Sequence, residues 1–374
     1  MRAARDQTLP IQFPPRLQKN RRHSILKRIR SSDFVIRLTH WEYWPFDLVY
    51  FPVMFYWIWL SIRARSFFFF SAANPGIEFG GMLGESKFRV LQNLPQPLVP
   101  QTLFCPSKSS PEETLAKVRN SGLSFPLICK PDVGERGWLI EKIDSEQQLI
   151  NYGQQMKVDF LIQDYIDLPM ELGIFYYRFP GQKQGTISSI TLKRFLTLKG
   201  DGESTLRQLI PADPRAKLQL KTLEIRFRNE LDLVLAKNEQ KVLVPIGNHR
   251  LGTAFLNGEE LISKKLVRIF DQVASGFEGF YFGRFDIRCR DREHLYQGDF
   301  QIMELNGAGA EPSHIYHPGA SIWDGYRVII SHLQILYQIS ALNRKAGFKY
   351  MTLKEGLQFL GKVRRYKKQQ ITFN

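Results

Sequence analysis

Two stretches near residue 300 alternate apolar and polar side chains with a period of two, which is typical of half-buried strands. They are RFDIRC (284–289) and FQIMEL (300–305), and a charged, turn-prone connector separates them. We therefore predict a hairpin in which Asp286 and Glu304 face one another. Asn306 lies two residues beyond Glu304, so it shares the same face of the sheet.

The same patterns predict further elements between the middle of the chain and this hairpin. A strand carries Lys130 and stops at the proline that follows it. A turn with Gly134, Arg136 and Gly137 comes next, and a second strand begins at Trp138. The remaining elements are a helix around 88–93, a helix within 111–122, a strand in 159–164, a strand from Glu171, and a strand pair in 188–199 before a short helix capped at Ser204.

An apolar and aromatic segment precedes these elements. Its longest uncharged piece, Leu48 to Ile62, has 15 residues and contains Pro52, whereas a membrane-spanning helix needs about 20. Tryptophan and tyrosine prefer the headgroup level of a bilayer, and Arg63 and Arg65 can reach lipid phosphates. We expect an interfacial membrane segment; the alternative is an aromatic helix packed on the domain.

The positive charge of the chain is concentrated at its two ends, in a sequence of otherwise ordinary composition. The 374 residues are 43% hydrophobic and 24% charged, as in ordinary globular proteins, and the three cysteines are too far apart for a zinc motif or a disulfide framework. The net charge of +16 lies at two places: residues 1–40 hold ten Lys or Arg and two acids, and residues 344–374 hold nine and one. Two basic ends on a neutral body indicate attachment to an anionic surface.

The hairpin also suggests a chemistry. Two carboxylates and an amide oxygen form a hard, all-oxygen ligand set, which suits Mg²⁺ together with water and substrate phosphate. In the turn after Lys130, the glycines would let backbone N–H groups approach a phosphate chain, and Lys130 and Arg136 would supply positive charge. No helix follows these glycines, so the turn is neither a Walker loop nor a dinucleotide fingerprint.

The order of these motifs resembles the ATP-grasp superfamily over roughly residues 84–331. The resemblance implies two α+β subdomains that clasp ATP, with Mg²⁺ or Mn²⁺ bridging to its phosphates. The implied metal ligands are Asp286, Glu304 and Asn306. The other implied roles are Lys130 on the α and β phosphates, Gly134, Arg136 and Gly137 in a flap over them, Gln163, Asp164, Tyr165 and Ile166 along the adenine, Glu171 on the ribose, Lys193 as a further phosphate contact, and Arg284 on the phosphate and the tetrahedral intermediate.

The chain departs from the D-alanine:D-alanine ligases, which its metal hairpin resembles most. Those enzymes begin with a complete α/β domain, and here the aromatic segment stands in its place. They also carry a His-Ser pair that receives the acceptor carboxylate, where this chain has EPSHIYHPG (311–319). These departures argue against a specificity for D-alanine. The residues placed where an acceptor would lie are Glu311, Ser313, His314 and His317, although His317 can equally organise a loop.

These observations divide the chain into five parts. They are a basic N-terminal tail (1–40), an aromatic membrane-associated segment (41–73), a reduced region before the nucleotide domain (74–124), an ATP-grasp domain (125–343) and a basic C-terminal tail (344–374). We expect an α+β fold that uses ATP and Mg²⁺ to join a small-molecule or peptide carboxylate to an amine or thiol. The protein is expected in the cytoplasm, peripheral on the inner face of the membrane.

Two alternatives stay open, and a third is not expected. The same fold could serve a small-molecule kinase that forms no acyl bond, or a non-catalytic nucleotide-binding protein at the membrane. An intact set of metal ligands counts against the second, because a scaffold has no use for it. Nucleic-acid binding through the basic ends is not expected, since the chain contains no recognition module.

Overall fold

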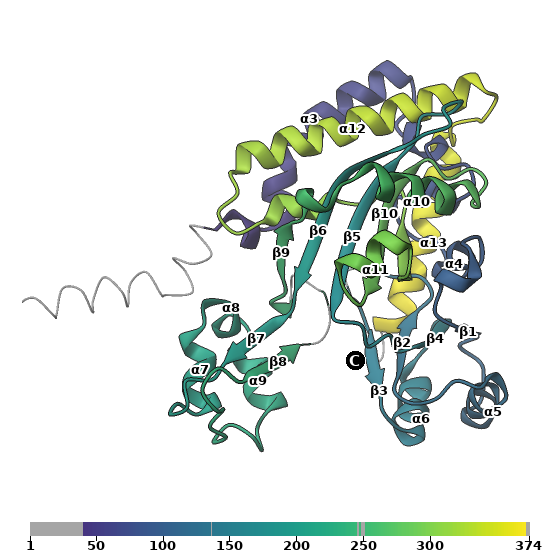
Figure 1. Cartoon of the computed structure of the whole chain (residues 1–374). Helices are drawn as coiled ribbons and strands as arrows, with labels where there is room; N and C mark the ends of the chain where they lie inside the picture. The colour runs from purple at the N-terminus through teal and green to yellow at the C-terminus, as the bar shows by residue number, and fades with distance from the viewer. Residues whose placement is uncertain (1–39, 136, 245–246, 248–250, 372–374) are drawn as a thin grey trace, which may run out of the picture.

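The computed structural model describes residues 40–135, 137–244, 247 and 251–371. They form two main sheets and a small two-stranded sheet, with helices packed around them (Figure 1). All strand pairings among the described residues are antiparallel. This mixture of helices and antiparallel sheets confirms the predicted α+β class. The predicted basic tail at 1–40 lies, except for its last residue, outside the described residues.

The first main sheet has four strands in the order β1-β4-β2-β3. Helices α5 and α6 cover this sheet. Helix α5 begins with a capping box at Ser110 and is ended by Gly122, whose φ of 80° suits glycine. The predicted second strand starts at Glu141, not at Trp138, because Gly137 and Leu139 both have positive φ and cannot belong to a strand. The elements are β1 (Thr102–Cys105), α5 (Pro111–Ser121), β2 (Leu127–Pro131), β3 (Glu141–Ile143), α6 (Glu146–Gln155) and β4 (Phe160–Asp164).

The second main sheet has five strands in the order β11-β10-β5-β6-β9. Asp286 lies directly opposite Glu304 in the β10–β11 register, which confirms the predicted facing pair. The connector holds a short helix, α11, in place of a simple turn, because Asp291 caps its start and Gly298 its end. The elements are β5 (Met170–Tyr177), β6 (Thr186–Arg194), β9 (Ala254–Asn257), β10 (Phe282–Cys289), α11 (Arg292–Gln297) and β11 (Gln301–Asn306).

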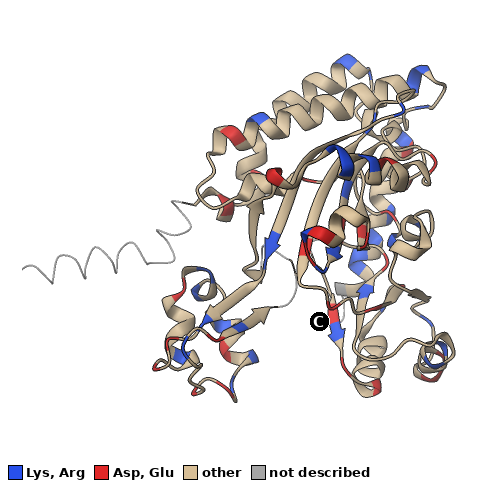
Figure 2. Cartoon of the chain, viewed as in Figure 1, with Lys and Arg blue, Asp and Glu red and all other residues tan. Residues whose placement is uncertain are grey.

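One face of the five-stranded sheet is covered by helices α3 (Phe46–Ala64) and α12 (Ile322–Lys345), which lie side by side (Figure 1). Figure 2 shows that these two helices carry few charged residues. Three of the four consecutive phenylalanines at 67–70, namely 68–70, are buried in this layer, together with Phe175 and Phe282 from the sheet. Part of the aromatic segment is therefore core, as the packing alternative expected, while other side chains of α3 are exposed.

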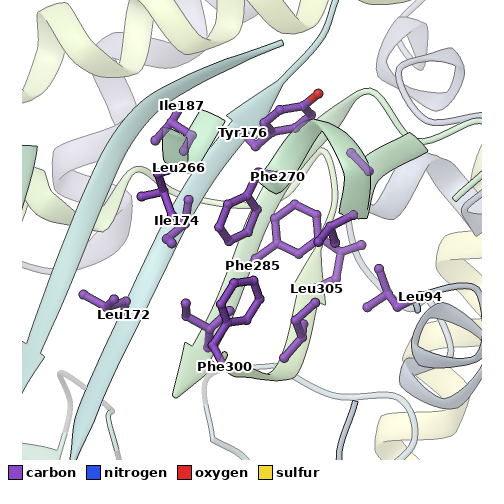
Figure 3. Close-up of a cluster of buried hydrophobic side chains, with 14 of the residues drawn as sticks. Leu94, Leu172, Ile174, Tyr176, Ile187, Leu266, Phe270, Phe285, Phe300 and Leu305 are labelled. Atoms are coloured by element: carbon purple, nitrogen blue, oxygen red, sulfur yellow. The ribbon is translucent and has the colours of Figure 1, made fainter. Parts of the chain in front are cut away.

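The other face of the five-stranded sheet packs against α10 (Lys264–Ser275) and α11. Phe270 from α10 stacks on Phe300 with ring centroids 5.4 Å apart, and both lie beside Phe285 of β10 (Figure 3). Burying each such side chain contributes roughly 1.5–3 kcal/mol. This core holds β10 and β11 in place, and with them the acidic pair.

A small helical insert follows β6. The predicted strand pair in 188–199 is wrong, because β6 pairs with β5 and β9 while β7 pairs with β8. Leu196 and Leu198 turn into a separate core within the insert. Its first helix is capped by Thr205 in a capping box with Gln208, and not by Ser204. The elements are β7 (Leu196–Lys199), α7 (Leu206–Ala212), α8 (Pro214–Lys217), α9 (Leu220–Arg226) and β8 (Gln240–Val244).

The predicted basic C-terminal tail contains a helix, α13 (Leu353–Ile371), that runs along both main sheets (Figure 1). Near its start, Phe359 stacks on Phe79 in the core of the larger sheet. Near its end, the Tyr366 hydroxyl donates to the Asp159 carbonyl at 2.9 Å beside β4. Short elements complete the fold: η1 (Trp41–Tyr43), η2 (Phe69–Ala72), η3 (Glu78–Gly81), α4 (Lys87–Gln92), η4 (Gln96–Leu98), η6 (Glu259–Leu261) and η7 (Ser313–Tyr316).

Candidate nucleotide and metal site

A cavity of about 1080 Å³ is lined by residues of both main sheets, of the insert and of the N-terminal segment. Pockets for drug-sized ligands measure about 300–1,000 Å³. The cavity therefore has room for a nucleotide and a second substrate. It brings together most of the residues that the sequence singled out, from strands that are far apart along the chain.

Asp286, Glu304 and Asn306 meet at one end of this cavity. The Asn306 side-chain amide donates to Asp286 Oδ2 at 3.2 Å, and the strand register places Glu304 across from Asp286. Within the described residues, no cluster of three or more His, Cys, Asp or Glu side chains is arranged to hold a metal. The set is instead two carboxylates and an amide, whose oxygens fit the hard ligand preference of Mg²⁺.

Cationic side chains surround both carboxylates. The Arg284 guanidinium donates to both oxygens of Asp286 at 3.0 Å, and Lys193 Nζ lies 3.4 Å from Oδ1. Burial would raise the pKa of Asp286, but Arg284 and Lys193 outweigh it and lower that pKa. Lys87 similarly lowers the pKa of Glu304 against the effect of burial. Both acids are therefore held ionised, as metal binding requires.

Lys87 was not singled out from the sequence, although it lies in the segment that leads into the nucleotide region. It is the first residue of α4, and its ammonium donates to Glu304 Oε1. Ser86 caps α4 and also donates to Asp132 after β2, which ties the helix to the glycine turn. The pairing of Lys87 with β11 spans more than 200 residues, so no local pattern could have revealed it.

Lys130 projects from β2 into the cavity. Its ammonium donates to Gln163 Oε1 at 2.8 Å and to the Met303 carbonyl at 3.2 Å, so it bridges the two main sheets. Burial is the largest influence on this lysine and lowers its pKa to about 8, although Glu304 acts in the opposite direction. A phosphate chain beside Lys130 would favour the charged form and raise the pKa again.

Glu171 lies at the centre of a buried ionic cluster. Its Oε1 accepts from Lys193 at 3.0 Å, and its Oε2 accepts from Arg288 Nη2 at 2.8 Å. Arg288 was missed from the sequence, although it lies two residues after Asp286 on the same strand face. Its Nη1 donates to the Ile166 carbonyl at 2.7 Å, which fixes the segment between β4 and β5.

Residues of that segment, of the end of β4 and of the glycine turn line the cavity together. Gln163, Asp164, Tyr165 and Ile166 all line the cavity, as does Gly137. Gly134 packs beside the Trp138 ring, whereas Arg136 lies outside the described residues. The predicted roles of these residues on adenine and phosphates stay predictions.

The four acceptor candidates separate in the structure. Glu311 and Ser313 line the cavity, and Arg284 Nη1 donates to the Glu311 carbonyl and to Ser313 Oγ, each at 2.8 Å. His317 is exposed, and its Nδ1 accepts from the Asn257 N–H at 3.1 Å, which is the loop-organising role. His314 is not among the residues that line the cavity, and burial lowers its pKa.

Comparisons with known proteins give structural likenesses only. No family model matches the chain, and no curated protein matches it. A bifunctional glutathione synthetase from Pasteurella multocida is 14% identical with a TM-score of 0.34; the match covers 63% of this chain and 34% of that one. The chain thus spans about a third of that protein's length.

Two further solved structures are similar over larger shares of their own length. A D-alanine–D-alanine ligase from Bacillus anthracis, complexed with ATP, is 12% identical with a TM-score of 0.39, covering 70% of this chain and 68% of that one. The VanG D-Ala:D-Ser ligase from Enterococcus faecalis is 14% identical with a TM-score of 0.36, covering 69% and 62%. At TM-scores below 0.5 these likenesses carry no functional argument, so a function has to be inferred from the site.

Proposed function

We propose that this protein is an ATP- and Mg²⁺-dependent ligase of the ATP-grasp type that activates a carboxylate as an acylphosphate for attack by an amine or thiol. The observation that carries the proposal is a pair of ionised carboxylates, the buried Asp286 and the partly buried Glu304, that face each other beside Asn306 in a cavity lined with buried cations. Such a set suits a nucleotide triphosphate and its metal ion.

The chain's own residues have assignable tasks in this reaction. Lys130 and Lys193 bind phosphate oxygens, while Asp286, Glu304 and Asn306 would hold Mg²⁺. When bound, the ion would neutralise charge that develops on the phosphoryl oxygens. A carboxylate oxygen of the substrate attacks the terminal phosphorus and ADP leaves; the nucleophile then attacks the acyl carbon and phosphate leaves. Arg284, which donates to Asp286 and to Ser313 Oγ, is placed to stabilise the charged intermediate.

The Lys130→Ala variant should bind MgATP markedly more weakly than the wild type. The side chain is 5% exposed and bridges the two main sheets, so its removal takes a positive charge from the centre of the cavity. Thermal-shift titration with MgATP checks this. If MgATP does not stabilise the wild-type protein, the nucleotide assignment is wrong.

The wild-type titration has a further expected feature. Because Lys130 has a pKa of about 8 and bound phosphates would raise it, binding takes up a proton at higher pH. The affinity for MgATP should therefore fall as the pH rises above about 8 and be largest below it. Lys130→Ala should show a weaker dependence over the same range.

Trapping with hydroxylamine separates a ligase from a kinase. An acylphosphate reacts with hydroxylamine to give a hydroxamate, whereas a phosphorylated alcohol does not. Incubation of the protein with MgATP, hydroxylamine and pools of carboxylic acids would therefore identify acyl activation, because hydroxylamine takes the place of the natural amine. Formation of ADP together with a phosphate ester, and without hydroxamate, would favour the kinase alternative.

We further propose that the protein acts at the inner surface of the membrane. Among the described residues, no helix combines the length and apolar character needed to cross a bilayer. Helix α3 nevertheless exposes a stripe of apolar side chains spaced three or four residues apart, away from its buried contacts with α12. The stripe residues are Leu48, Phe51, Phe55, Ile58 and Ile62. Such a stripe beside a basic tail suits interfacial binding to anionic lipid.

The triple variant Phe51→Ser, Phe55→Ser, Ile62→Ser should lose binding to anionic vesicles. These side chains are at least 62% exposed, so the fold does not depend on them. We expect the wild-type chain to float with vesicles of phosphatidylcholine and phosphatidylglycerol at low salt, and the variant to bind at least about tenfold less, because burial of each side chain contributes roughly 1.5–3 kcal/mol.

The matched control replaces three exposed apolar residues of the insert, Ile225, Val234 and Val242, by serine. This control should float like the wild type. A wild-type protein that stays with the soluble fraction at low salt would contradict membrane attachment.

A further inference from the structure

Residues of the N-terminal aromatic segment line part of the cavity. Glu42 accepts from Arg215 Nη2 of the insert at 2.9 and 2.8 Å, and the Trp41 indole donates to the Ala320 carbonyl at 2.7 Å. Tyr50, in the first turns of α3, donates its hydroxyl hydrogen bond to Glu311. The segment therefore does more than cover the sheet: it forms a wall of the space beside the metal ligands.

Glu311 lies in the loop after β11, lines the cavity and is contacted by this wall. Its Oε1 accepts from Tyr50 and, at 3.4 Å, from the Tyr316 hydroxyl. In the part of the chain that the structure describes, Glu311 makes no ion pair, in contrast to Asp286, Glu304 and Glu171. A carboxylate that is oriented by neutral hydroxyl groups keeps its negative charge available for a ligand.

Two described arginines that line the same cavity are each paired with another acid. Arg284 donates to both oxygens of Asp286, and Arg215 donates to both oxygens of Glu42. Arg284 hydrogen-bonds to Glu311 at its backbone carbonyl, and the charge of the Glu311 carboxylate contributes to raising the pKa of Arg284, but the guanidinium makes its ion pair with Asp286. Among the described residues, the negative charge of Glu311 therefore lies beside the reaction centre without an ion pair of its own.

Aromatic rings complete the surroundings of Glu311. Tyr43, Trp44, Phe46 and Tyr316 line the same cavity, and Trp41 packs on Tyr316 with centroids 5.1 Å apart. The faces of aromatic rings attract ammonium groups, and a carboxylate among such rings strengthens that preference. An anionic or neutral second substrate would gain less from these groups.

We propose that Glu311 binds the ammonium group of an amine substrate, in a subsite whose other wall is the aromatic segment 41–50. This inference rests on the proposed ligase function and specifies its nucleophile as an organic amine with an apolar or aromatic flank. The amine binds as its ammonium ion and must pass a proton to the Glu311 carboxylate or to solvent before its nitrogen attacks the acyl carbon. It also assigns a role in the second substrate site to a segment for which the sequence suggested membrane association or packing on the domain.

The test compares two ligands that have the same shape and differ in charge. Phenethylamine, which is cationic at neutral pH, and 2-phenylethanol, which is neutral, are titrated into the full-length protein with MgADP and followed by calorimetry. We expect the wild type to prefer the cation by at least tenfold. Equal binding of the two probes would overturn the proposal, and this comparison needs no variant.

The Glu311→Gln variant should remove that preference. The glutamine carbonyl can still accept from both tyrosine hydroxyls, so the local hydrogen bonds are kept while the charge is lost. Glu293→Gln, an exposed change on α11, is the matched control and should bind both probes like the wild type. An unchanged preference in Glu311→Gln would also overturn the proposal.

The outcomes separate this inference from the proposed function. If MgATP fails to stabilise the wild type, the ligase assignment falls whatever the amine does. If MgATP binds but the charged and neutral probes bind equally, only the ammonium site falls. Lys130→Ala should lose nucleotide affinity and keep the preference for the cation, since the Lys130 ammonium donates to Gln163 and Met303 and not to Glu311.

Discussion

Glu304→Gln and Asp286→Asn should each lower ATP turnover by on the order of 100-fold or more while the fold stays intact. Each substitution keeps the volume of the side chain and removes one negative charge from the pair that faces across β10 and β11. The change leaves the surrounding cations Lys87, Lys193 and Arg284 with one fewer acid and weakens the proposed metal site. Release of ADP in the presence of Mg²⁺ and carboxylic acid pools is the measurement.

Glu293→Gln again serves as control, since it is an exposed glutamate outside the cavity. Circular dichroism and thermal melting show whether the variants are folded. Folded Glu304→Gln and Asp286→Asn proteins that turn over ATP as fast as the wild type would refute the placement of the metal site.

Glu171→Ala should destabilise the protein by about 3–5 kcal/mol, the usual cost of breaking a buried ion pair by removing one partner. The Lys193 and Arg288 side chains are 8% and 7% exposed, and both donate to Glu171. Without the acid, two cations stay buried with less compensating charge. The midpoint of urea unfolding should fall accordingly.

The control for this prediction is Glu146→Ala, which breaks the ion pair between Glu146 and Arg119. In that pair the arginine side chain is 64% exposed and the glutamate side chain 46% exposed. Exposed pairs of this kind contribute about 0–1 kcal/mol. A double variant, Glu171→Leu with Arg288→Met, should recover part of the lost stability, because it removes one buried cation together with the acid. Similar losses for Glu171→Ala and Glu146→Ala would contradict the role of the buried cluster.

The features that the sequence predicted well are those encoded locally. The alternation around Asp286 and Glu304 placed both on one face, and the order of the two strands left one plausible pairing. Helix α5 was predictable because its cap at Ser110 and its stop at Gly122 are signals within the segment itself.

The features that were missed depend on distant parts of the chain. Strand β7 continues the pattern of β6 so closely that only the partner β8, more than 40 residues later, reveals the separate insert. Lys87 and Arg288 are ordinary charged residues until Glu304 and Glu171 are brought beside them. Helix α3 in the aromatic segment carries apolar side chains on its buried face and on its exposed face. The sequence pattern therefore could not distinguish the face that packs from the face that is exposed.

Helix α13 has a consequence for how the protein is made. Its Tyr366 bonds to Asp159, 207 residues earlier, and Gln370 accepts from the Lys157 N–H. At a synthesis rate of about 5–20 residues per second, the ribosome needs roughly 10–40 s to produce this partner after the four-stranded sheet has emerged. During that interval the surface around Asp159 is uncovered, so the nascent chain is a natural client for chaperones until α13 docks.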